Sequence, residues 1–159
     1  MSDRTARVRT DRLTGLPNRV AWTDALEAER VRRSRYRRPV VVMTVDVDGL
    51  AATNRRRGRR HGDELLVGAA GVLRHSLRDA DLVARIGEDE FGVLLPETQA
   101  AAMEPLVQRI QAACAEWRGS DPELRLSVSI GWAVPEPFGE LRGAVRTADE
   151  RMHLAKRGA

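Results

Sequence analysis

The sequence predicts an α+β or mixed α/β domain in which helices pack on a central sheet. Two observations support this fold class. Apolar side chains recur at three- and four-residue steps in several segments, as on the buried face of a helix. Between these segments lie short runs rich in β-branched and other apolar residues, which are typical of buried strands.

The first half of the chain is expected to form a helix, a buried strand and a second helix. Apolar residues at roughly helical spacing predict a helix over 20–36, and Pro39 ends that region. The run 40–45 is β-branched and apolar on both faces, as in the central strand of a sheet. A second helix is expected over 63–77, where the apolar residues share one face.

The second half is expected to form a hairpin, a helix, a strand and a final helix. Two short apolar runs over 82–86 and 91–95, separated by a polar turn, predict the hairpin. Periodic apolar residues predict a helix over 99–117. Strict alternation predicts a strand over 124–134, and a helix is expected over 141–157.

Length and composition indicate one globular domain. The chain has 159 residues, enough to bury a core without disulfides, and its 42% hydrophobic and 31% charged residues are ordinary for such domains. Cys114 is the only cysteine, which excludes an intrachain disulfide and fits a reducing cytoplasm. No apolar run approaches the roughly 18 residues of a membrane span, and none follows Met1 as in a signal peptide. We expect a flexible lead over residues 1–10 and a single domain over 11–159.

Positive charge is carried almost entirely by arginine. Lys156 is the only lysine among 27 basic residues, which oppose 23 acidic residues for a net charge of +4. Two arginine clusters, over 32–38 and 55–60, are either solvated surface or binding faces for nucleic acid, a membrane surface or a nucleotide. Aromatic residues make up only 4% of the chain and do not alternate with basic ones, so no nucleic-acid partner is expected.

Acidic residues lie at the ends of predicted strands. Asp46 and Asp48 close the first buried strand, and Asp89 and Glu90 lie in the turn of the hairpin. If these strands are neighbours, the carboxylates converge and repel one another unless a divalent cation lies between them. Oxygen ligands of this kind favour Mg²⁺ bound together with substrate phosphates, as in nucleotidyl transfer. The alternative is that these acidic residues simply form turns.

The sequence resembles the GGDEF domain of diguanylate cyclases over nearly its whole length, from Asp11 to Lys156. Six motifs occur in the family's order and at its spacing. In chain order they are Asp11-Arg12-Leu13-Thr14-Gly15-Leu16-Pro17-Asn18-Arg19, Asp46-Val47-Asp48, Asn54 with Gly58 and Gly62-Asp63, Arg85-Ile86-Gly87-Glu88-Asp89-Glu90-Phe91, Ser129-Ile130-Gly131-Trp132-Ala133, and Ala148-Asp149 through Ala155-Lys156. The resemblance implies a mainly antiparallel sheet of about five strands flanked by helices, related to adenylyl cyclase and polymerase palms.

The resemblance also implies an activity, the condensation of two GTP into cyclic di-GMP across a homodimer, with Mg²⁺ or Mn²⁺. The implied metal ligands are Asp46, Asp89 and the Val47 carbonyl, with Glu90 as a further catalytic acid. The implied substrate-binding residues are Asn54 and Asp63 at the guanine edge, with Gly87 and Lys156 near phosphate.

A second site is implied by Arg78 and Asp81, which form the family's Arg-x-x-Asp pair at the expected interval before the hairpin signature. In the family this pair binds the product, cyclic di-GMP, as an inhibitor. Arginine suits such a ligand because its planar donors match both phosphate oxygens and the Hoogsteen edge of guanine.

Two positions depart from the family pattern. Glu88 stands at the second glycine of the signature and adds bulk and negative charge near a triphosphate. Ala51 stands where the family usually has a lysine, and the arginines at 55–60 are candidates to replace that charge. Three interpretations therefore stay open. They are an active diguanylate cyclase, a pseudo-enzyme that binds GTP or cyclic di-GMP and signals to a partner, and a basic adaptor for nucleic acid or membrane.

Overall fold

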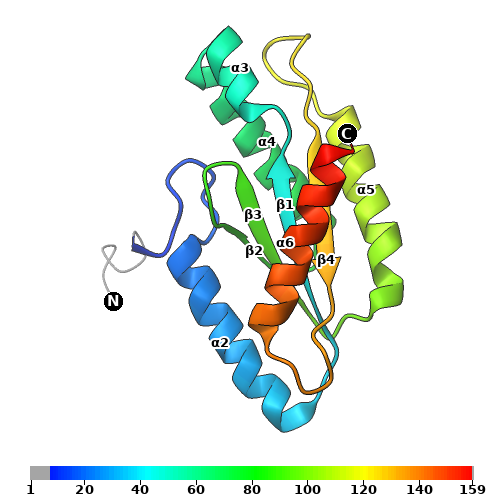
Figure 1. Cartoon of the computed structure of the whole chain (residues 1–159). Coiled ribbons are helices and arrows are strands. Elements are labelled where there is room, and N and C mark those ends of the chain that lie inside the picture. Colours follow the sequence, from blue (N-terminus) through cyan, green and yellow to red (C-terminus); the bar gives the residue numbers. More distant parts are fainter. Residues whose placement is uncertain (1–7, 159) are drawn as a thin grey trace.

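The computed structural model describes residues 8–158 as helices packed on both faces of an antiparallel sheet (Figure 1). In chain order the elements are α2 (Arg19–Tyr36), β1 (Val40–Val47), α3 (Leu50–Arg57), α4 (Arg59–Ser76), β2 (Leu82–Arg85), β3 (Glu90–Pro96), a 3₁₀ turn (Ala100–Ala102), α5 (Met103–Glu116), β4 (Val128–Ala133) and α6 (Leu141–Arg157). The α+β class expected from the sequence is confirmed.

The sheet within the described residues has four strands in the order β2-β3-β1-β4, and every pair is antiparallel. The expected number of about five strands was therefore one too high, and the strand expected over 124–134 is shorter. β4 begins at Val128, which lies opposite Val47, the last residue of β1. Because β1 ends there, residues 124–127 have no strand to pair with along their length, although Leu124 and Leu126 are still buried.

Two apolar layers enclose the sheet. Along β1, Val41, Met43 and Val45 point into the layer shared with α4 and α5, whereas Val40 and Val42 point into the layer shared with α2 and α6. Figure 1 shows α2 and α6 in front of the sheet. Burial on both faces explains why every residue of β1 is buried and why its sequence is mainly apolar.

The segment between β1 and α4 differs from the sequence prediction. The structure forms an additional helix, α3, and α4 begins at Arg59 rather than at residue 63. The two helices are separated only by Gly58, whose φ of 90° lies in a region that L side chains rarely adopt. Residues 51–57 are mostly polar and lack helical apolar periodicity, so the sequence offered no signal for α3.

Residues 1–7, most of the expected flexible lead, lie outside the described part of the chain. Residues 8–10 are attached to the domain. Thr10 forms a β-bridge with Pro17, and Asn18 bonds to the carbonyls of Val8 and Arg9. Across residues 8–158, no helix combines the length and apolar character needed to cross a bilayer.

Gly131 in β4 fixes how closely α6 approaches the sheet. A Cβ atom at this position would lie 2.0 Å from the Ala148 carbonyl oxygen and 2.2 Å from the Met152 nitrogen, both in the α6 backbone. We expect Gly131→Ala to lower the free energy of unfolding by roughly 2–3 kcal/mol, because the helix must move away. Gly143→Ala, on α6 with nothing within 4 Å of the added atom, should be neutral or slightly stabilising. Urea denaturation measures both, and equal stability of the two variants would contradict this packing account.

Candidate functional site

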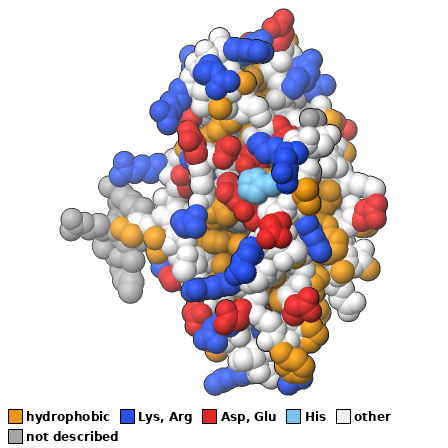
Figure 2. Space-filling view, in the orientation of Figure 1, with side chains coloured by type: hydrophobic (Ala, Val, Ile, Leu, Met, Phe, Trp, Pro, Cys, Tyr) orange, Lys and Arg blue, Asp and Glu red, His pale blue; other side chains and the backbone are white. Residues whose placement is uncertain are grey.

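Acidic side chains converge where β1 ends and the β2–β3 hairpin turns. Asp46 pairs with Glu90 in the β1–β3 register. The Val47 N–H donates to the Asp89 carbonyl at 2.9 Å, which brings the hairpin turn against the end of β1. On the face shown in Figure 2, acidic side chains gather near this end of the sheet with Lys and Arg side chains around them. The expected convergence of Asp46, Val47, Asp89 and Glu90 is therefore present in the fold.

Lys156 reaches this cluster from α6. Its Nζ donates to Asp46 Oδ1 at 2.5 Å and lies 3.5 Å from the Val47 carbonyl oxygen. Burial raises the pKa of Asp46, and the charges of Asp89 and Asp48 add to this effect, which exceeds the lowering by Lys156. Burial lowers the pKa of Lys156, but its hydrogen bond to Asp46 and the surrounding carboxylates outweigh that and raise it. Burial is the main cause of the shift at Asp46, and the neighbouring carboxylates add to the upward shift of the pKa of both groups.

Glu90 carries the largest perturbation in this cluster. Burial, a hydrogen bond with Asp149 and the charges of Asp149, Asp46 and Asp89 raise the pKa of Glu90 to about 7. Of the carboxylates of Asp46, Asp89 and Glu90, only that of Asp46 has a cation in hydrogen-bond contact among the described residues, the Lys156 ammonium. The carboxylates at this end of the sheet therefore outnumber the cations that could neutralise them.

The donor set matches a divalent cation that shares its coordination with a substrate. No group of three or more His, Cys, Asp or Glu side chains within residues 8–158 forms a complete metal cluster. Two carboxylates, Asp46 and Asp89, and the Val47 carbonyl are nevertheless oxygen donors brought to one place. Mg²⁺ typically binds through one or two carboxylates and completes its octahedral shell with phosphates and water. The residues present fit that mode of binding.

Asn54 and Asp63 lie on neighbouring helices, α3 and α4. The Asn54 side chain packs against Gly62, where a Cβ atom would lie only 1.8 Å from Asn54 Oδ1. That oxygen is buried and has no hydrogen-bond partner among the described residues. A buried acceptor without a donor is uncommon in folded proteins and marks a position where a bound group can supply one.

Arg78 and Asp81 lie at the opposite end of the β2–β3 ladder. Asp81, only 2% exposed in its side chain, accepts hydrogen bonds from Arg78 Nε at 3.2 Å and Nη2 at 2.8 Å. Nη2 also donates to the Pro96 carbonyl and to Thr98 Oγ1. Nη1 makes no hydrogen bond with any described residue, and the Arg78 side chain is 56% exposed. Arg78 is thus oriented by a buried carboxylate and lines a hollow of about 580 Å³.

Comparison with known proteins decides the family. The sequence model of the family described as diguanylate cyclase, GGDEF domain, matches residues 8–159. The chain belongs to the GGDEF family. The diguanylate cyclase DgcP of Pseudomonas aeruginosa is 36% identical to it over 161 residues, which cover 99% of this chain and 24% of DgcP. The bifunctional diguanylate cyclase/cyclic di-GMP phosphodiesterase MucR of the same organism is 37% identical over 151 residues, which cover 92% of this chain and 22% of MucR. This GGDEF chain therefore spans about a quarter of the length of these curated relatives.

Solved GGDEF structures share the fold. Diguanylate cyclase SiaD from P. aeruginosa, solved with its activator SiaC, superposes with a TM-score of 0.89 at 30% identity, covering 98% of this chain and 62% of SiaD. The GGDEF domain of DgcB from Caulobacter crescentus, solved with c-di-GMP, gives a TM-score of 0.89 at 25% identity, covering 95% of this chain and 89% of that one.

The hairpin signature of this GGDEF domain forms a tight turn. The N–H groups of Ile86 and Gly87 both donate to the Glu90 carbonyl, at 2.9 and 3.2 Å. Arg85 Nη2 donates to the Glu88 carbonyl at 2.7 Å. Glu88 is exposed, and so is Ala51 at the start of α3.

The two arginine clusters differ in their pairing. In the first, Arg33 donates to the backbone carbonyls of Glu136 and Gly139, and Arg38 pairs with Glu97. These contacts inside the domain favour the solvated-surface interpretation of residues 32–38. In the second, Arg57 is paired, whereas the other arginines of residues 55–60 are exposed.

Asp149 on α6 was absent from the residues proposed from the sequence. It is hydrogen-bonded to Glu90, and it precedes Lys156 by seven residues. Residues seven apart share one face of a helix, so this spacing was a usable signal once Lys156 was placed at the site. The Asp48 carboxylate links the end of β1 to β4 and the segment before it, because it accepts hydrogen bonds from Ser127 Oγ at 2.7 Å and Ser129 Oγ at 2.6 Å.

Glu90→Gln is expected to stabilise the metal-free protein at neutral pH. A carboxyl group with a raised pKa in the folded state favours folding below its ordinary value of 4.5, and that contribution is lost as the pH rises through about 7. The variant should therefore unfold with a free energy roughly 1–2 kcal/mol higher at pH 8, after allowance for solvent screening, and close to wild type at pH 4. Urea denaturation with a chelator at both pH values measures this. The control is Glu150→Gln, at an exposed position on α6. A pH-independent effect of Glu90→Gln would contradict the prediction.

Proposed function

We propose that this GGDEF domain condenses two molecules of GTP into cyclic di-GMP in the presence of Mg²⁺ or Mn²⁺. The observation that carries the proposal is the convergence of Asp46, Asp89 and the Val47 carbonyl beside Glu90 and Lys156. The names of the relatives DgcP and MucR, both called diguanylate cyclases, support the same activity.

The divalent ion would be held by Asp46, Asp89 and the Val47 carbonyl, and when bound it neutralises triphosphate charge and favours ionisation of the attacking hydroxyl. Lys156 then has a second role. In the structure its ammonium neutralises Asp46, and once Asp46 ligates a cation the ammonium is available to a phosphate oxygen. Glu90 lies next to these groups and is the side chain placed to accept the hydroxyl proton.

The guanine base would lie between α3 and α4. An Asp63 carboxylate accepts hydrogen bonds from the N1 and N2 donors of guanine, a pair that adenine does not offer. The buried Asn54 Oδ1, without a donor among the described residues, is a second acceptor facing the same segment. Because each domain holds one GTP, the two bond-forming steps require two domains to meet as a homodimer, and each step releases pyrophosphate.

GTP is expected to bind at least about tenfold more tightly than ATP, because a polar site built for one base leaves unpaired groups against the other. Calorimetric titration with both nucleotides in Mg²⁺ measures this. Asp63→Ala should remove the preference. Asp79→Ala, which removes an exposed carboxylate outside α4, should keep it. Equal affinity of the wild-type protein for the two nucleotides would contradict the guanine site.

A second candidate function is a binding module that holds GTP or cyclic di-GMP without turnover. The observation that favours it is the pair of departures at the phosphate end. Glu88 adds an exposed negative charge to the hairpin turn, and Ala51 brings no positive charge to the start of α3. Binding of GTP without any product would support this alternative.

A further inference from the structure

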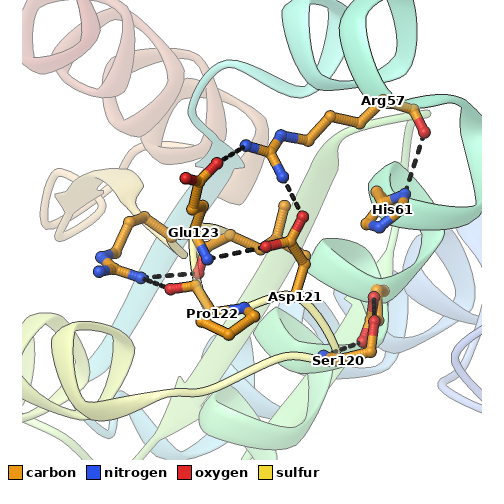
Figure 3. Close-up of polar contacts among 9 residues, drawn as sticks. Arg57, His61, Ser120, Asp121, Pro122 and Glu123 are labelled. Atoms are coloured by element: carbon orange, nitrogen blue, oxygen red, sulfur yellow. Dashed lines mark hydrogen bonds and ion pairs between the residues drawn. The ribbon is translucent and has the colours of Figure 1, made fainter.

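The two helices that carry the proposed guanine-binding residues, α3 and α4, each contact the loop formed by residues 120–123 (Figure 3). Arg57, the last residue of α3, donates from Nη2 to Glu123 Oε2 at 2.6 Å and from Nη1 to Asp121. Glu64, in α4, accepts from the Ser120 N–H at 2.6 Å and from Ser120 Oγ at 2.8 Å. The loop therefore forms hydrogen bonds with both α3, which carries Asn54, and α4, which carries Asp63.

The loop is itself held in place by a hydrogen bond within it and by the buried residues that follow it. Asp121 Oδ1 accepts the Glu123 N–H at 2.9 Å, so its carboxylate is held from inside the loop as well as by Arg57. These two interactions lower the pKa of Asp121 despite partial burial, so it stays ionised at neutral pH. Leu124 and Leu126 follow directly and are 4% and 5% exposed, which anchors the loop in the apolar core.

The contacts lie close to the proposed guanine-binding residues. Arg57 follows Asn54 by three residues, and Glu64 follows Asp63 directly. Between the two helices the chain has only Gly58, which has no side chain to brace the corner. The Arg57 carbonyl is 3.0 Å from His61 Nδ1, a local contact across the same corner. α4 is held by its own buried apolar face, whereas α3 buries only Leu50, so the loop contacts of Arg57 add long-range support mainly to α3.

We infer that Arg57, Asp121 and Glu123, the Arg57 cluster, are positioning residues that set the separation of Asn54 and Asp63 and thereby the selectivity for guanine over adenine. The inference rests on the proposed function. The Arg57 and Asp121 side chains are 32% and 26% exposed, and that of Glu123 is 79% exposed, so the Arg57–Asp121 pair carries most of the effect. Partly exposed ion pairs contribute little to global stability, so the effect belongs to the geometry of the site.

The test measures the affinities of GTP and ATP separately, by calorimetry in Mg²⁺. Arg57→Gln and the double variant Asp121→Asn/Glu123→Gln remove the ion pairs from either side with little change in volume. Each should weaken GTP binding by about fivefold or more and change ATP binding less than about twofold. Arg57→Lys, which keeps the charge, should recover part of the loss. Arg35→Gln is the matched control, because Arg35 lies on α2, is exposed and makes no side-chain polar contact with a described residue.

Two further measurements separate positioning from a general structural role. The free energy of unfolding in urea and the affinity for cyclic di-GMP at Arg78 should stay at wild-type values in all these variants. An unchanged GTP-to-ATP ratio in both Arg57→Gln and the double variant would overturn the inference while leaving the proposed function intact. A wild-type protein that does not distinguish GTP from ATP would instead overturn the proposed guanine site, and the inference with it.

Discussion

Asp89→Asn is expected to abolish formation of cyclic di-GMP. The Asp89 backbone is hydrogen-bonded to Val47 at 2.9 Å, and its charge helps to raise the pKa of Asp46, so its carboxylate lies near that of Asp46. A neutral amide binds a small, highly charged cation far more weakly than a carboxylate does. Changing a residue that contacts a metal ligand, without touching the metal itself, lowers metal affinity or activity about 10–100-fold. Loss of a direct ligand should therefore lower activity more than about 100-fold. Product chromatography after incubation with GTP and Mg²⁺ measures it.

The control for this variant is Glu150→Gln, which removes the same charge from an exposed position on α6 and should keep turnover. Urea denaturation of Asp89→Asn should show a protein at least as stable as wild type, because one of the mutually repelling carboxylates has been neutralised. Wild-type turnover by Asp89→Asn would refute its assignment as a metal ligand.

Arg78→Ala is expected to weaken cyclic di-GMP binding by at least tenfold, about 1.4 kcal/mol. The truncation removes a guanidinium that the buried Asp81 orients and whose Nη1 edge has no acceptor among the described residues. This site lies at the far end of the β2–β3 ladder from Glu88, so it does not depend on the hairpin turn. Calorimetric titration with cyclic di-GMP measures the loss, and the affinity of the wild-type protein should fall with added salt because the ligand is a dianion.

Arg74→Ala is the matched control, since it removes the same charge four residues earlier, from a side chain whose one hydrogen bond reaches Thr14. It should change the affinity for cyclic di-GMP only slightly. Equal affinities of wild type and Arg78→Ala would place the ligand elsewhere on the domain.

The elements with strong periodicity could be predicted from the sequence. The helix expected over 20–36 is found at Arg19–Tyr36, and the helix expected over 141–157 at Leu141–Arg157. In α6 the spacing also identifies the buried face, with Leu141, Ala144, Ala148 and Met152 packed on the sheet. In α2 it does not, because Val20 and Val31 are exposed and Trp22 is the buried apolar residue. The hairpin and the buried strand β1 were likewise predicted, because continuous β-branched runs bounded by turn residues leave few alternatives.

Features set by tertiary contacts could not be predicted. α3 lacks an apolar stripe, and residues 124–127 alternate like a strand although β1 has already ended opposite them. The Arg57–Asp121 contact joins residues 64 positions apart, and no local sequence pattern predicts such a pair. At the candidate site, the acidic residues and Lys156 were proposed from motif spacing, whereas Asp149 was recognised only when the structure brought it to Glu90.

The most direct test of the proposed activity is chromatographic identification of the product after incubation of the wild-type protein with GTP and Mg²⁺ or Mn²⁺. The account predicts cyclic di-GMP, with two GTP consumed and two pyrophosphate released for each molecule formed. It also predicts a rate per domain that rises with protein concentration, because two domains must meet. GTP that binds with guanine selectivity yet remains unconverted at high protein concentration with either metal ion would contradict it.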